Sequence, residues 1–230
     1  MFKLDSPFMN FLNKVADIMI LNILFIVFSI PIVTMGASFT AAYYMGFKMI
    51  KNEESYIIKG FWKAFKENFK QSTIIWIIVL LIAAILFADY RIILYSGISF
   101  AKWLRISMVT VTVVVLMGAV YVFALQARFT NTVKNTIKNS FLMSLSHLPT
   151  TILLIAVYAI PVIVLYFIPQ SLPALVLLAC GGIIYLKSFF LLKVFKKYET
   201  DLIEKDDELA QGEEPDSGLF AESEKMEKEN

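Results

Sequence analysis

The longest stretch of this chain without Asp, Glu, Lys or Arg runs from Asn139 to Leu186. Three further charge-free runs extend over Ile18–Phe47, Gln71–Ala88 and Ile106–Ala127. A helix that spans a membrane needs about 20 mostly apolar residues, and all four runs are close to that length or longer. Because the runs are apolar on every side, they are typical of lipid-immersed helices rather than of the two-faced helices of a soluble core.

The charges divide the chain into two parts. Residues 1–198 contain 18 Lys and Arg against 6 Asp and Glu, whereas residues 199–230 contain 3 against 13. We therefore predict a basic transmembrane helical domain over 1–198 and an acidic, disordered cytoplasmic tail over 199–230. The basic part is expected to face anionic lipid, and no nucleic-acid motif accompanies it.

The positions of the basic residues predict the topology. Six lysines lie between Lys48 and Lys70, three basic residues between Arg128 and Lys138, and four between Lys187 and Lys197. These segments are expected in the cytoplasm by the positive-inside rule, together with the C-terminus. The connections Asp89–Arg105 and Ile168–Pro173 are then expected outside, and Pro169 to Pro173 form the turn between the last two helices.

The first charge-free run is too long for one straight span. Pro31, Thr34 and Gly36 supply a helix breaker, a potential capping side chain and a flexible residue, so we expect a structural turn there between two helices. The chain then has about six membrane helices in three hairpins, with both termini inside. The alternative is a single tilted first helix, which gives five crossings.

A lysine-rich amphipathic segment precedes the second hairpin. Its lysines follow one helical stripe and its aromatic residues the neighbouring stripe, a pattern typical of a helix in the membrane interface. The residues predicted to contact lipid or a partner are Lys59, Trp62, Lys63, Phe65, Lys66, Phe69 and Lys70. A weaker copy lies between Phe129 and Phe141, and this similarity favours either an internal repeat or independent helices that enter the membrane alike.

Few residues are candidates for chemistry. Asp89 and Arg91 are expected to form an ion pair at the outer rim or a binding site, and Lys187 is expected to reach the interface with its long side chain. The single His147 and the single Cys180 cannot assemble a multi-ligand metal site or an intramolecular disulfide. We predict no catalytic, cofactor-binding or metal-binding residues, and no enzymatic activity.

The first 75 or so residues resemble the YesL-like family of bacterial integral membrane proteins, a domain of unknown function numbered 624. The resemblance lies in Phe28-Ser29-Ile30-Pro31-Ile32-Val33-Thr34-Met35-Gly36-Ala37, in Tyr43-Tyr44, and in Phe65-Lys66-Glu67-Asn68-Phe69-Lys70-Gln71-Ser72. It implies a setting beside carbohydrate-uptake ABC transporters in Gram-positive bacteria. It assigns no reaction and no site residues.

Two functions remain open. The first is an accessory subunit or regulator of a carbohydrate ABC importer in the bacterial cell membrane, with membrane lipids and the permease subunits as partners. The second is a stand-alone transporter or channel for a small uncharged solute such as a sugar, favoured by the broken first run and the hairpin repeat.

Overall fold

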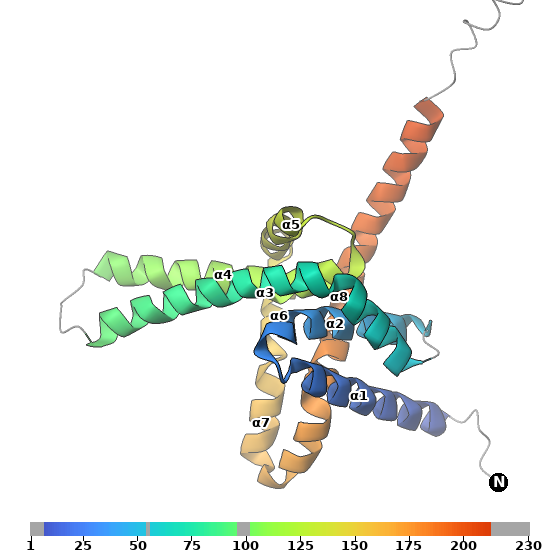
Figure 1. The fold of residues 1–230 in the computed structure, drawn as a ribbon, viewed down its shortest axis with the longest axis horizontal. Helices are drawn as coiled ribbons and strands as arrows, with labels where there is room; N and C mark the ends of the chain where they lie inside the picture. The colour runs from blue at the N-terminus through green and yellow to red at the C-terminus, as the bar shows by residue number, and fades with distance from the viewer. Residues whose placement is uncertain (1–6, 54–55, 96–101, 213–230) are drawn as a thin grey trace, which may run out of the picture. The chain divides into compact units, whose positions relative to one another are not determined.

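The computed structural model describes residues 7–53, 56–95 and 102–212, and these form eight α-helices and two short 3-10 helices (Figure 1). Five of the helical segments are long and apolar enough to cross a membrane: Phe8–Ser29, Ile57–Ile93, Lys102–Arg128, Leu148–Phe167 and Pro169–Tyr198. The predicted all-α, multi-span fold is confirmed. The chain divides into two compact units, Met1–Leu192 and Lys193–Asn230, which are described separately.

The first charge-free run forms an antiparallel hairpin. Helix α1 covers Pro7–Ser29, a 3-10 helix η1 covers Ile32–Thr34, and α2 covers Met35–Lys51. At the turn, the Thr34 hydroxyl donates to the carbonyl oxygen of Phe28 at 2.6 Å. At the open end, the Lys14 ammonium donates to the Met49 carbonyl oxygen and to the Asn52 side chain, both at 3.1 Å. The predicted helix-turn-helix is confirmed, and the single tilted helix is wrong.

Helix α2 lies at the centre of the first unit and is packed mainly through small residues. Gly36 lies so close to α3 (Ile57–Tyr95) that an added Cβ would stand 2.5 Å from both the Ser72 carbonyl oxygen and the Trp76 Cβ. The buried hydroxyls of Thr40 and Ser72 hydrogen-bond at 2.8 Å. With 17 residues, α2 is shorter than the five potential spans.

Helix α3 joins the amphipathic segment and a membrane span into one continuous helix of 39 residues. Figure 1 shows that its beginning runs in a different direction from the remainder, which lies beside α4 (Lys102–Arg128). The turn of the first hairpin meets α3 at Trp76, whose indole nitrogen donates to the Ile32 carbonyl oxygen at 2.7 Å. That level is about 20 Å along the helix from Asp89, so the turn does not reach the outer end of α3.

Polar side chains join α3, α4 and α5 (Val133–Ser146) near the predicted cytoplasmic side. The buried Gln126 amide donates to Gln71 at 2.7 Å and to Asn68 at 3.3 Å, and its oxygen accepts from Thr136 at 3.2 Å. Gln71 in turn donates to the Asn131 carbonyl oxygen at 2.8 Å. We call these contacts the Gln126 network.

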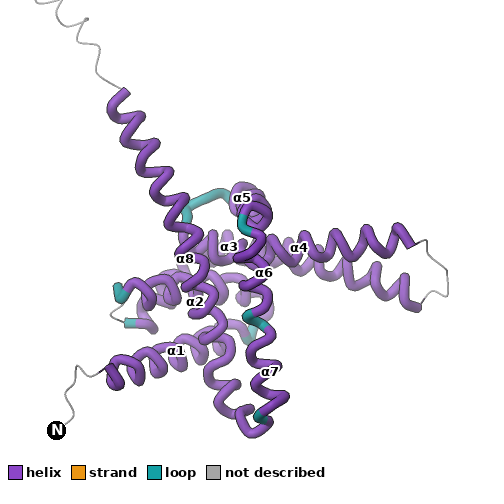
Figure 2. Tube along the Cα trace, turned by 180° about the vertical axis from the view of Figure 1, so that it is seen from behind, coloured by secondary structure: helices purple, strands orange, loops and turns teal. Residues whose placement is uncertain are grey.

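The last charge-free run contains more breaks than the sequence predicts. It forms the end of α5, then α6 (Leu148–Ala156) and α7 (Ala159–Phe167), the 3-10 turn Pro169–Ser171, and the start of α8 (Leu172–Gly212). The predicted turn at Pro169 is confirmed, whereas the interruption between α6 and α7, visible in Figure 2, is additional. Pro161 has no N–H to donate to the carbonyl oxygen of Val157, which explains the break.

The first and last membrane helices are joined through one buried side chain. The Asn22 amide of α1 donates to the Val176 carbonyl oxygen at 3.0 Å and accepts from the Gly181 N–H at 2.9 Å. Gly181 permits this approach because a Cβ there would stand 2.7 Å from the Ile18 carbonyl oxygen. In the second unit, α8 continues as a helix to Gly212, and residues 213–230 of the predicted acidic tail lie outside the described residues.

Candidate functional site

The predicted interfacial residues occupy the beginning of α3. Lys59, Lys63, Lys66 and Lys70 are exposed, and Trp62 and Phe69 are 43% and 40% exposed. The Lys66 ammonium lies 5.0 Å from the centroid of the Trp62 ring. We call these six residues the basic face. A surface that combines ammonium groups with half-exposed aromatic rings can bind anionic headgroups or an acidic protein surface.

Phe65, the remaining predicted interfacial residue, points into the protein. It is buried, and its ring centroid lies 5.1 Å from that of Phe28 in α1. The Phe28 ring also contacts Phe61 and Trp62. These aromatic contacts fix the start of α3 to the end of α1. The helix that carries the basic face is therefore held in place by aromatic packing against α1.

The predicted turn residues have distinct roles. Pro31 precedes η1 in an extended conformation. Thr34 donates its hydroxyl to the Phe28 carbonyl oxygen at 2.6 Å and its backbone N–H to the Pro31 carbonyl oxygen at 2.9 Å. Gly36 already belongs to α2, where it allows the close approach to α3. Gly36 is thus needed because it has no side chain, which lets α2 and α3 pack closely, and not because its backbone is flexible.

The structure reveals a second polar centre, which was not predicted from the sequence. Lys187 of α8 is 1% exposed, although it was expected to extend to the interface, so that expectation is wrong. Its ammonium donates to the Tyr158 hydroxyl at 2.8 Å and lies 4.4 Å and 5.7 Å from the ring centroids of Tyr158 and Tyr43. We call these three residues the Lys187 centre.

The Lys187 centre lies at the break between α6 and α7. Tyr158 is one of the two residues that separate these helices, and the residue is 47% exposed. Along the described ranges, no carboxylate forms an ion pair with Lys187. A charged group inside a membrane domain costs at least about 2.5 kcal/mol, so its retention beside a broken helix marks a candidate binding site.

The sequence does contain signals for this centre. Lys187 ends the longest charge-free run, and Pro161 lies in the middle of the preceding span. What the sequence alone could not supply is the pairing of α8 with α2 and with the α6–α7 break. That pairing buries the ammonium.

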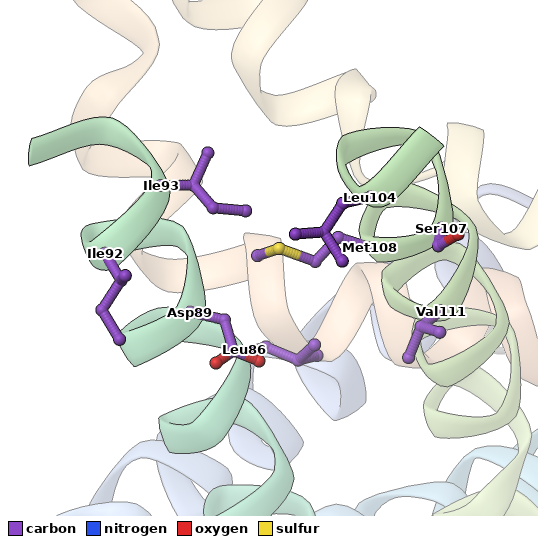
Figure 3. A pocket seen from close by; sticks show the side chains of 8 residues that line it. All are labelled: Leu86, Asp89, Ile92, Ile93, Leu104, Ser107, Met108 and Val111. Atoms are coloured by element: carbon purple, nitrogen blue, oxygen red, sulfur yellow. The ribbon is translucent and has the colours of Figure 1, made fainter. Parts of the chain in front are cut away.

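Asp89 and Arg91 do not form the expected ion pair. The Arg91 guanidinium lies 4.3 Å from the centroid of the Tyr95 ring, and Asp89 lines a pocket between the outer ends of α3 and α4 (Figure 3). Residues two apart on a helix point in different directions, which explains the outcome. Among the described residues, no group of three His, Cys, Asp or Glu could hold a metal ion.

Comparisons with known proteins concern the first half of the chain. No curated protein and no solved structure matches this chain. The family model described as "Protein of unknown function, DUF624" matches residues 18–90, which include most of α1, all of α2 and most of α3. The resemblance predicted from the sequence is therefore confirmed over this segment: the chain is a multi-span membrane protein whose residues 18–90 match this family model.

Proposed function

We propose that this protein is a non-catalytic accessory subunit or regulator of a carbohydrate ABC import system in the bacterial cell membrane. The observation that supports the proposal is the basic face, which has four exposed lysines and two half-exposed aromatic rings. The helix that carries it is held against α1 by the contact between Phe65 and Phe28. Such a surface fits a membrane partner with acidic cytoplasmic residues, as well as anionic lipid. The sugar importer is the partner that the family resemblance implies.

The proposal includes a topology with both termini in the cytoplasm. The Lys14 contacts with Met49 and Asn52 bring the start of α1 beside the end of α2, and the lysine-rich segment follows directly. A reporter enzyme that works only in the cytoplasm is expected to be active when fused to the N-terminus. Activity of a periplasmic or extracellular reporter at that position would contradict this topology.

Affinity purification from native membranes tests the partnership. A tagged chain is expected to recover carbohydrate permease subunits, and the charge reversal Lys63→Glu with Lys66→Glu is expected to reduce their recovery severalfold. The matched control is Lys134→Glu with Lys138→Glu, which reverses two exposed lysines of α5. Failure to recover any permease, or an equal loss in both double variants, would count against the basic face as the contact.

The Lys187 centre favours a second candidate, a transporter for a small uncharged solute such as a sugar. Sugar hydroxyl oxygens accept hydrogen bonds from an ammonium, and tyrosine rings provide flat apolar surfaces beside it. The interrupted α6–α7 helix supports this candidate, because broken helices commonly form transporter binding sites.

Transport by reconstituted liposomes distinguishes the two candidates. If the chain is a transporter, it moves labelled sugar, and Lys187→Met lowers the rate while Lys134→Met, at an exposed position of α5, leaves it unchanged. If no sugar moves under any imposed gradient, the second candidate is wrong, and the accessory role is unaffected.

A further inference from the structure

A pocket of about 340 Å³ opens between the outer ends of α3 and α4 (Figure 3). Its walls are apolar side chains from both helices: Leu86 and Ile93 from α3, and Leu104, Met108 and Val111 from α4. Figure 3 shows Ile93, Leu104 and Met108 converging on the space between the helices. The volume falls at the lower end of the range of small-molecule pockets, enough for part of an elongated apolar group.

One carboxylate lies in this apolar lining. Asp89 is exposed, and no described side chain or backbone group hydrogen-bonds or pairs with it. The other polar lining residue, Ser107, donates its hydroxyl to the Trp103 carbonyl oxygen of its own helix. Asp89 is therefore the one charged side chain among the residues that line the pocket.

The charge pattern of α3 indicates the depth of the pocket, at the level of the lipid headgroups. Asp89 directly follows the charge-free run Gln71–Ala88, so its carboxylate is placed where the apolar span ends. Leu86 lies nearly one turn deeper along α3 and Val111 deeper along α4, on the side of the hydrocarbon. Beside them, the hydroxyls of Tyr90 and Thr112 hydrogen-bond at 3.2 Å and hold the two helices together.

We propose that this pocket binds a phospholipid with an ammonium headgroup, of the phosphatidylethanolamine type. The ammonium pairs with the Asp89 carboxylate, and one acyl chain lies against Leu86, Met108 and Val111. An anionic lipid would bring its charge against Asp89, and a purely apolar occupant would leave the carboxylate without a partner. The site is independent of the basic face and of the Lys187 centre.

Lipid titration of the purified full chain in non-ionic detergent tests the proposal, with bound lipid counted by native mass spectrometry. Phosphatidylethanolamine is expected to bind about fivefold more tightly than phosphatidylglycerol with the same acyl chains, the upper range for a solvent-accessible ion pair. Asp89→Asn should abolish the preference. Met108→Trp, which fills the pocket, should weaken the binding of both lipids.

Two controls keep the test decisive. Glu67→Gln removes an exposed carboxylate from the other end of α3 and should leave the preference intact. On the unaltered chain, an N-acylated phosphatidylethanolamine, which has no ammonium, should bind like phosphatidylglycerol. Equal binding of the two parent lipids, or a preference that survives either Asp89→Asn or loss of the ammonium, would overturn the proposal.

Discussion

The two halves of α3 have the same helical backbone but opposite surroundings. Its first half packs one side against α1, α2, α4 and α5, with buried residues Ile57, Phe61, Ala64, Phe65, Ser72 and Ile75. Its second half lies beside α4 and exposes Leu81, Ile85, Phe87 and Ile92. Packing between helices demands complementary shapes, whereas lipid adapts to any apolar surface. Substitutions should therefore lower the free energy of unfolding more in the first half than in the second.

The largest effect is expected at the contact between Gly36 and α3. Gly36→Ala places a methyl group 2.5 Å from the Ser72 carbonyl oxygen, where backbone rather than a flexible side chain must move. Overpacking of this kind should lower the free energy of unfolding by about 3 kcal/mol. Equilibrium unfolding in mixed micelles measures it. Gly182→Ala is the control, since no atom lies within 4 Å of its added Cβ, and equal losses would refute the argument.

The second largest loss of unfolding free energy is expected in the Gln126 network. Gln126→Leu removes the acceptor for Thr136 and leaves a buried hydroxyl without that partner. The expected loss is about 2 kcal/mol of unfolding free energy, the cost of an unsatisfied buried polar group. Thr136→Val in the same background should restore part of the loss. A double variant as unstable as the sum of the two single variants would mean that the two side chains are not coupled.

A smaller effect is expected for the hydrogen bond between α2 and α3. Thr40→Val and Ser72→Ala each remove one hydroxyl of the 2.8 Å pair, and the double-mutant cycle gives their coupling. We expect about 0.6 kcal/mol, the average for hydrogen bonds between membrane helices. A coupling indistinguishable from zero would indicate that the contact between Thr40 and Ser72 depends on shape alone.

The smallest effect is expected in the outer half. Tyr90→Phe removes the hydroxyl that contacts Thr112 at 3.2 Å, and Thr112 keeps a hydrogen bond to the Met108 carbonyl oxygen at 2.9 Å. The unfolding free energy should fall by about 0.5 kcal/mol or less. A loss as large as that of Gln126→Leu would show that the two halves of α3 do not differ in the way described.

Local sequence signals predicted the fold best where one residue type determines the conformation. Pro31 and Thr34 marked the turn between α1 and α2, and Pro169 marked the last turn, because proline restricts the backbone wherever it occurs. Pro161 carries the same signal but lies within a uniformly apolar run. There the length of the run favoured one unbroken span over α6 and α7.

The candidate sites were only partly predictable, because they depend on which helices become neighbours. The stripe of lysines beside Trp62 and Phe69 follows from helical periodicity alone. The burial of Lys187 depends on α2 and on the α6–α7 break, and that of Phe65 on the end of α1. Hydropathy gives the number and length of the helices, but it does not specify which faces meet.

The position of Asn22 also restricts how the chain can mature in the membrane. Its amide leaves the ribosome early, yet its partners, the Val176 carbonyl and the Gly181 N–H, are synthesised 154 and 159 residues later. Until α8 inserts, the hydrocarbon offers Asn22 no equivalent acceptor or donor. A nascent chain stopped before residue 176 would thus hold the Asn22 amide in lipid without these two partners, so α1 reaches its final hydrogen bonding only after α8 is made.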